Sequence, residues 1–334
     1  MDSLFERMCE ARGRKPLDRG ALNSTDQVEV SKSLGFFNWL NEEHGRSRNP
    51  GLKIEIGFYD SHQVNAFATI FEGADVIAIS WEAVKSLRDL FHDVLDLPVL
   101  TWIDEPYRPA AATWLYRCGM HFIFMHELGH VWHGHTSLVE RHGIATMDEV
   151  TAFPDGTLGN LDRQTLEFDA DAFAATNVFN YTVFSCPFPV VNPAWEDFGH
   201  GMTSLIMTAF SLHLLFRVFD KAVNFDLDAQ RPHPSPPLRQ LILAETMTAQ
   251  AEEKGGFLSA SEIIEWGIKG AEEAYAKRQR MPFDDTAIQE AKGPEGKKYI
   301  AKLLRNWHSI RPQLDPLKRG GLLPPTQEVD DGFA

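Results

Sequence analysis

Two histidines and a glutamate stand near the middle of the chain, in the run His126-Glu127-Leu128-Gly129-His130. Residues four apart lie on the same face of a helix, so the imidazoles of His126 and His130 can bind one metal ion. Glu127 is rotated by one residue, which places its carboxylate beside the metal, where a base acting on a metal-bound water is needed. The spacing is the H-E-x-x-H pattern of catalytic zinc sites. We therefore interpret His126 and His130 as zinc ligands and Glu127 as the general base.

Further histidines lie close to this motif, at His121, His133 and His135. They fall outside the i, i+4 pair, and we expect them to have ordinary packing or supporting roles. The uncharged residues 123–125 and 131–132 favour a buried helix around the motif. The alternative is a helix whose histidines are simply buried or surface residues, and a third ligand elsewhere in the chain would argue against it.

A candidate third ligand lies downstream, where Glu167 and Asp171 share one face of an expected helix. Glu167 would complete a three-ligand zinc site and leave the fourth position for water. Asp171, one turn later, could accept the free ring N–H of a ligand histidine and fix its tautomer. Small residues at Ala170 and Ala174 would let the two helices approach closely. The alternative is a solvated acidic face, which we expect for Asp169 because it points away.

Together these segments resemble the gluzincin peptidases. The run 167–174, E-F-D-A-D-A-F-A, follows H-E-L-G-H as in the family of the CaaX-prenyl protease and the bacterial heat-shock membrane protease, whose pattern is H-E-x-x-H and then E-x-x-A-D. Residues 65–68, N-A-F-A, are similar to a segment that precedes the metal helix in that family. His233-Pro234, with Arg239 six residues after His233, is similar to its H-P-x-x-x-x-R segment. The resemblance covers residues 52–245.

Two groups of soluble peptidases are also similar to the chain. The phage-exclusion Lit peptidases share the H-E-x-x-H core, and this resemblance implies limited cleavage of a cytosolic protein as part of a defence or stress response. The regulatory metallopeptidases that cut phage repressors have E-x-x-A-N in place of E-x-x-A-D. The family of the CaaX-prenyl protease is embedded in membranes, so the soluble groups fit this chain better.

The resemblance and the residue chemistry together predict a Zn²⁺ site with further catalytic residues. We expect Glu127 to take a proton from water and pass it to the leaving amine. His233 is our candidate donor to the oxyanion, although its prolines could simply make it rigid, and Arg239 could assist it, bind substrate or hold the loop. The strand at 65–69 could pair with an extended substrate, which would place Asn65 near the cleft as a substrate-binding residue, unless it is a turn residue.

The composition narrows the possible partners. Of the 334 residues, 43% are hydrophobic, which is typical of a globular protein with a sizeable core. Lys plus Arg number 32 and Asp plus Glu 47, giving a net charge of −15. An acidic chain is a poor candidate for binding nucleic acid, so we expect a protein or peptide substrate.

Cellular location follows from three further features. The cysteines Cys9, Cys118 and Cys186 are widely spaced and odd in number, as expected of isolated thiols in a reducing compartment. Residues 1–15 mix acidic and basic side chains and do not form a signal peptide. The apolar run 201–216 is too short to span a membrane. We therefore expect a cytoplasmic protein that is not membrane-embedded.

Periodicity predicts the order of the elements. Three consecutive short strands with tight connections should pair antiparallel, at 52–59, 64–71 and 75–80. Residues 1–22 look irregular. Ser259 and Glu262 form the pattern of a capping box. We expect helices from Ser24 to a break at 49–51 and over residues 81–95, 109–134, 161–179, 195–223, 238–253, 259–280 and 297–307.

We therefore predict an α+β protein with a mostly helical, zincin-like (gluzincin) domain and a small antiparallel sheet. The expected divisions are an N-terminal helical segment at 1–50, a metallopeptidase domain at 51–254, a C-terminal helical extension at 255–321 and a disordered tail at 322–334. The predicted function is a soluble zinc-dependent endopeptidase. The alternatives are a metal-binding regulatory or scaffold protein without proteolytic activity and a metal-free helical interaction protein.

Overall fold

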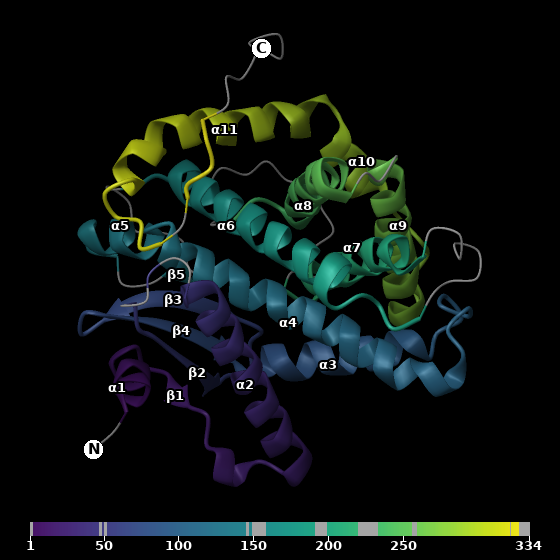
Figure 1. The fold of residues 1–334 in the computed structure, drawn as a ribbon, viewed down its shortest axis with the longest axis horizontal. Helices are drawn as coiled ribbons and strands as arrows, with labels where there is room; N and C mark the ends of the chain where they lie inside the picture. Colours follow the sequence, from purple (N-terminus) through teal and green to yellow (C-terminus); the bar gives the residue numbers. More distant parts are fainter. Residues whose placement is uncertain are drawn as a thin grey trace.

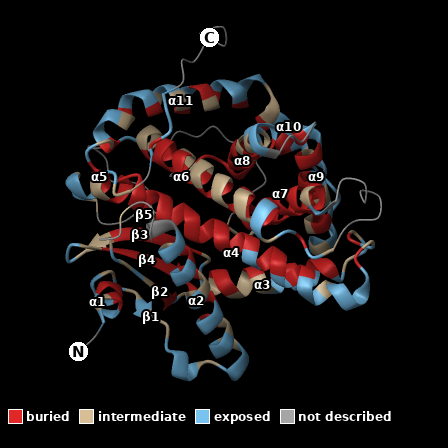
Figure 2. Ribbon diagram, viewed as in Figure 1, coloured by how far each residue is buried: buried red, intermediate tan, exposed pale blue. Residues whose placement is uncertain are grey.

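A small sheet lies at one end of a mostly helical body in the computed structural model (Figure 1), which confirms the α+β class. The central helix α4 (Arg108–Trp132) carries the H-E-x-x-H motif and is buried along most of its length (Figure 2). It begins with Pro109 in its first turn, where a missing N–H costs no hydrogen bond. The structure describes residues 3–46, 49, 52–144, 147–148, 158–190, 199–219, 233–255, 259–320 and 322–326.

Most of the expected helices and strands are present. The remaining helices are α1 (Leu4–Ala11), α2 (Ser24–Arg46), α3 (Trp81–Leu95), α5 (His135–Arg141), α6 (Asn160–Asn180), α7 (Gly199–Phe219), α8 (Pro236–Gln250), α9 (Ala260–Gln279), α10 (Thr286–Lys292) and α11 (Pro294–Leu314). The strands are β1 (Lys15–Pro16), β2 (Ile54–Asp60), β3 (Ala66–Phe71), β4 (Ala74–Ser80) and β5 (Met147–Asp148). Of these elements, α5, α10, β1 and β5 were not predicted, and α11 is longer than the predicted 297–307. The ends of the predicted helix 195–223, at 195–198 and 220–223, lie outside the described residues.

The sheet is mixed, so the prediction of an antiparallel sheet is wrong. Its strand order is β1-β2-β4-β3-β5. β3 and β4 form the expected antiparallel hairpin, but β2 pairs with β4 in parallel. β4 thus lies between β2 and β3, and it is buried on both faces. Its run of apolar residues suits a central strand better than an edge strand, which is the physical reason for the crossover.

Residues expected to be irregular form helix α1, which covers one face of the sheet. Phe5 and Met8 of α1 pack against Phe67 and Val76, which point to that face. A Cβ on Gly57 of β2 would lie 2.6 Å from ring atoms of Phe5, so this glycine is needed for the close approach. The helix is short and amphipathic, and its apolar positions are too few to stand out from the polar sequence around them.

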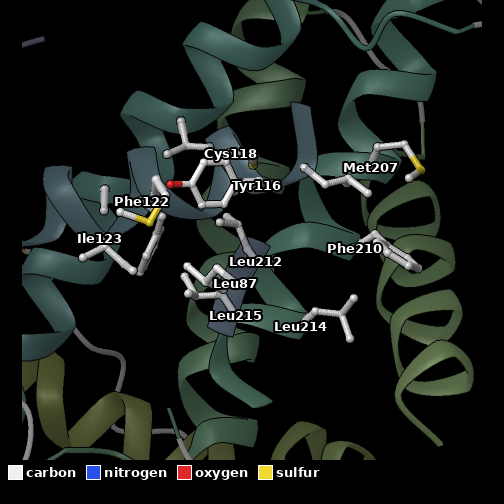
Figure 3. Close-up of a cluster of buried hydrophobic side chains, with 14 of the residues drawn as sticks. Leu87, Tyr116, Cys118, Phe122, Ile123, Met207, Phe210, Leu212, Leu214 and Leu215 are labelled. Atoms are coloured by element: carbon white, nitrogen blue, oxygen red, sulfur yellow. The ribbon is translucent and has the colours of Figure 1, made fainter. Parts of the chain in front are cut away.

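The main core includes side chains of α4, of α3 and α7, which pack against it, and of α9, which packs against α7. Figure 3 shows part of it, where side chains of α3, α4 and α7 meet. Among the residues that the structure describes, α7 is the one helix long and apolar enough to cross a membrane by length and composition, and 89% of the relevant window is buried inside the protein. Because α9 contributes Ile263, Ile264 and Ile268 to the same cluster, the helices after residue 255 share the core of the preceding segment.

Two details of the C-terminal region differ from expectation. Ser259 has a φ of +62° and makes no side-chain capping bond, so the predicted capping box is wrong. Leu323 is buried, and the carbonyl of Pro324 accepts a hydrogen bond from Trp307 Nε1 at 3.3 Å. Leu323 and Pro324 of the expected disordered tail therefore pack against α11, whereas Leu322 is exposed, and residues 327–334 lie outside the described part of the chain.

Candidate metal centre

Helices α4 and α6 pack closely, and small residues permit this contact. A Cβ built on Gly129 of α4 would lie 3.5 Å from the Cα of Ala170 and 3.0 Å from the ring of Phe173 on α6. Ala170 and Ala174 are fully buried. The expectation that small residues bring the two helices together is confirmed. The close approach lets side chains of both helices meet at one point.

The side chains that meet there are His126 and His130 of α4 and Glu167 of α6, which we call the primary group. The Nε2 atoms of the two histidines lie 3.0 Å apart. Glu167 Oε2 lies 3.1 Å from His126 Nε2 and 3.6 Å from His130 Nε2. All three residues are buried. The sequence predicted this convergence from the i, i+4 spacing and from the downstream carboxylate.

These distances fit a set of metal ligands. Ligand atoms bound tetrahedrally to zinc at about 2.0–2.1 Å are separated by about 3.3 Å. The three separations in the primary group, 3.0, 3.1 and 3.6 Å, lie on both sides of that value. Imidazole nitrogen and carboxylate oxygen are also ligand types that zinc accepts. The primary group could therefore hold a metal ion.

Asp171 is bound to His126 as expected, and Arg239 holds Asp171. The Nδ1 of His126 lies 2.9 Å from Asp171 Oδ1, on the side of the ring away from the primary group. Arg239 donates from two nitrogens to the two oxygens of Asp171, each at 2.8 Å. The Arg239 guanidinium also lies over the Phe216 ring, 4.6 Å from its centroid. These contacts account for the position of Arg239 without a substrate. The substrate-binding role expected for Arg239 stays a prediction.

The charges of the group are strongly coupled. Burial disfavours protonated His126, but hydrogen bonds to Asp171 and Glu167 outweigh it and raise the pKa of His126 well above its ordinary value. Burial lowers the pKa of His130 to about 4, against the attraction of Glu167. The pKa of Glu167 is held well below its usual range, because the surrounding histidines outweigh burial. Ionised Glu167 and neutral His130 are the forms that bind a cation.

Two of the predicted catalytic residues lie beside the primary group. Glu127 is buried and follows His126 directly on α4. His233, which precedes α8, has its Nδ1 3.1 Å from Glu167 Oε2. Its side chain is 11% exposed, compared with 2% for Glu167. The structure therefore brings residues from three separate parts of the sequence together, as expected from their motifs.

Asn65 lies just before β3, where its backbone is hydrogen-bonded to Ser80, the N-cap residue of α3. Its N–H donates to Ser80 Oγ at 3.0 Å, and its carbonyl accepts from the N–H of Ser80 at 2.8 Å. On the β3 side, Phe67 and Ala68 are paired with β5. β3 is thus not an open edge at these two residues, where a substrate strand was expected to pair. The substrate-binding role of Asn65 stays a prediction.

A second group lies next to the first, and the sequence predicted it only in part, because supporting roles were expected for its histidines but not for its carboxylate. It consists of His133, His135 and Asp169, which we call the neighbouring group. Asp169 was expected to face solvent, but it is 2% exposed and contacts both histidines. The cause is Gly134, whose φ of +83° ends α4 with a left-handed turn and directs the chain back toward α6. The H-G-H run was the available signal.

The remaining histidine of α4 has the packing role expected of it. His121 is buried and makes edge contacts with Phe36 and Tyr181, with ring centroids 5.6 and 4.9 Å apart.

A cavity of about 760 Å³ between α6, α8 and α11 has Asp169 in its lining but none of the primary group. We therefore locate the candidate chemistry at the primary group and not in this cavity.

Comparison with known proteins adds no relative: no protein-family model, curated protein or solved structure matches the chain. The functional interpretation depends on the residues of the chain itself and on the way that the fold assembles them.

Proposed function

We propose that the chain is a zinc-dependent peptidase that hydrolyses peptide bonds of a protein substrate. The observation that supports this most is the primary group itself, with ligand atoms 3.0 to 3.6 Å apart. Glu127 follows ligand His126 on the same buried helix. Three protein ligands and an adjacent carboxylate are the components that a catalytic zinc site needs.

The proposal of zinc depends on the ligand types. Two imidazoles and one carboxylate suit zinc, and three protein ligands are the number typical of its catalytic sites. Asp171 lies 2.9 Å from His126 Nδ1, where it can orient the ring, and the proposed ligand Glu167 lies 3.1 Å from His126 Nε2. When bound, a zinc ion supplies positive charge that lowers the pKa of water to roughly 7 and polarises a carbonyl group.

In the proposed reaction, Glu127 moves the proton. Its carboxylate takes a proton from the attacking water as the new C–O bond forms at the peptide carbonyl. The same carboxyl group then gives the proton to the leaving nitrogen as the C–N bond breaks. Burial of Glu127 beside the ligands limits competition from bulk water for these proton transfers.

His233 is suited to stabilise the oxyanion. Its Nδ1 contacts Glu167, a member of the primary group. The side chain of His233 is more exposed than those of Glu167 and His126. A hydrogen-bond donor placed at the developing negative charge contributes to the rate because it needs no rearrangement. We propose that a substrate carbonyl reaches the centre from the side of His233.

The substrate class follows from charge. A net charge of −15 disfavours nucleic acid and is compatible with a protein or peptide, including a basic one. We also propose that the protein works in the cytoplasm and is not membrane-embedded, since the apolar helix α7 is used to build the core.

One observation favours a second candidate, a metal-binding protein that cuts nothing. Every residue of the primary group is at most 3% exposed, as in structural metal sites, which are closed. In such a protein the metal would stabilise the contact between α4 and α6, and Glu127 would serve only packing.

Terminal proteomics separates the two candidates. Cells that express wild-type protein are compared with cells that express Glu127→Gln, which keeps the size of the side chain but removes the base. A peptidase produces new protein termini in the first culture that are absent from the second. Identical termini in both cultures, with metal bound in both purified proteins, would favour the non-hydrolytic candidate.

A further inference from the structure

The neighbouring group is connected directly to the primary group. His135 Nδ1 lies 2.9 Å from His130 Nδ1. On the other side of its ring, His135 Nε2 lies 3.2 Å from Asp169 Oδ2. The same oxygen of Asp169 is in hydrogen-bond contact with His133 Nδ1. An unbroken series of contacts thus leads from a ligand of the primary group to a buried carboxylate.

The protons along this series can be assigned by chemistry. His130 directs Nε2 toward the other ligands, so in a metal-bound, neutral His130 the proton is on Nδ1. That N–H faces His135 Nδ1, which must then be the acceptor. Neutral His135 therefore carries its own proton on Nε2, the ring nitrogen that lies 3.2 Å from Asp169 Oδ2.

A second metal ion at the neighbouring group conflicts with this assignment. The three side chains could hold an ion by their spacing. A metal on His135 Nε2 would place the ring proton on Nδ1, opposite the N–H of metal-bound His130. Two N–H groups would then face each other at 2.9 Å, unless one imidazole lost a second proton. The arrangement therefore favours one ion and a hydrogen-bonded support.

We propose that His135 and Asp169 are positioning residues that hold His130 in the Nδ1–H tautomer, and that the chain binds one ion per molecule. This rests on the proposed metal site. Partners of this kind fix ring orientation and raise the basicity of a ligand imidazole. The two ligand histidines are then supported differently: His126 by the carboxylate of Asp171, and His130 through a second imidazole.

The test measures zinc affinity by competition with a chelator, in three variants. His135→Leu removes the acceptor for His130. His135→Asn restores an acceptor, because its amide oxygen stands close to the position of Nδ1. His121→Asn is the matched control, since it removes another buried histidine of α4, whose ring packs against Phe36 and Tyr181. Loss of an outer partner of a ligand histidine weakens metal binding about 10–100-fold.

We expect this loss in His135→Leu, most of the affinity back in His135→Asn, and wild-type affinity in His121→Asn. Unchanged affinity in His135→Leu, or an equal loss in the control, would overturn the proposal. So would two zinc ions per chain at saturation, or a ¹⁵N spectrum of the zinc-loaded protein without His130 as its Nδ1–H tautomer. If wild-type protein binds no zinc at all, the metal site itself is wrong. If it binds one ion and His135→Leu binds it equally well, only the positioning role fails.

Discussion

Two buried clusters in the helical body each contain histidine and glutamate but are completed differently: one by a second histidine, the other by an arginine. In the primary group, Glu167 and two imidazoles direct their ligand atoms toward one point. In the arginine cluster, formed by His213, Arg217 and Glu272, the carboxylate accepts hydrogen bonds from Arg217 Nε at 2.8 Å and Nη2 at 2.5 Å. His213 Nε2 contacts the same carboxylate.

The two clusters differ in what balances the charge of the buried carboxylate. Glu272 is neutralised by a guanidinium of the chain, whose planar fork matches a carboxylate. In the primary group, two imidazole nitrogens face each other at 3.0 Å beside a carboxylate, and a cation that replaces the proton of His126 would meet three ligand atoms. Replacement of the glutamate by glutamine should therefore have different consequences in the two clusters.

The largest effect is expected for Glu167→Gln. The amide retains the shape of the side chain but loses the negative charge and one ligand type, so zinc affinity should fall by more than the roughly 100-fold typical of an outer partner. Chelator competition measures this. Glu140→Gln, an exposed change on α5, is the control. Wild-type affinity in Glu167→Gln would show that this carboxylate is not a ligand.

Glu272→Gln should give the opposite result. It leaves a buried Arg217 without its counter-ion, and breaking a buried pair costs about 3–5 kcal/mol of folding free energy. Urea denaturation of the zinc-loaded protein measures the loss, while zinc affinity should stay at the wild-type value. The surface pair of Arg278 and Asp93 is the control, and Asp93→Asn should cost at most about 1 kcal/mol. Weakened zinc binding in Glu272→Gln would contradict the separation of the two clusters.

Asp171→Asn tests the support of the other ligand histidine. The neutral side chain is a weaker acceptor for His126 and a poorer partner for Arg239, so zinc affinity should fall about 10–100-fold. Asp162→Asn removes a carboxylate from the first turn of the same helix and should leave affinity unchanged. Equal affinities in the two variants would argue against an orienting role for Asp171.

The smallest effect is a pH dependence in the arginine cluster. Burial lowers the pKa of His213 below its ordinary 6.5, despite Glu272. The unfolded chain therefore takes up a proton as pH falls below that value, and stability falls with it. The pKa of Glu272 is also lowered, since His213 and Arg217 outweigh burial, so acid acts in the same direction near pH 4. His213→Gln should reduce the loss of stability between pH 7 and pH 5.5, measured by urea denaturation, by at most about 1 kcal/mol. An unchanged pH profile would contradict the neutral, buried state of His213.

The sequence predicted best those features that depend on helical periodicity alone. The i, i+4 spacing of His126 and His130, and that of Glu167 and Asp171, predicted which residues share a helix face. The start of α4 at Arg108 and the bounds of α3 also followed from period and proline position. The assembly of His233 with Glu167 was expected from motif resemblance alone, because residues so far apart in the chain meet only through the fold.

The features that were not predicted depend on contacts between residues far apart in the sequence, which helical or strand periodicity does not indicate. Asp169 points away from Glu167 on its helix, but that direction is toward α5 and not toward solvent, because Gly134 turns the chain back. The parallel pairing of β2 with β4 requires a crossover that short connections did not suggest. The two bonds of Arg239 to Asp171 were not predicted either, because they depend on where α8 packs.

The coordination of zinc in wild-type protein tests the central claim most directly. X-ray absorption of protein loaded with one equivalent of zinc reports the number and type of ligand atoms. We predict two imidazole nitrogens and one carboxylate oxygen at about 2.0–2.1 Å, with a water-derived oxygen as the fourth ligand. A spectrum with fewer than two imidazoles, a sulfur ligand, or no retained zinc would contradict the site formed by His126, His130 and Glu167.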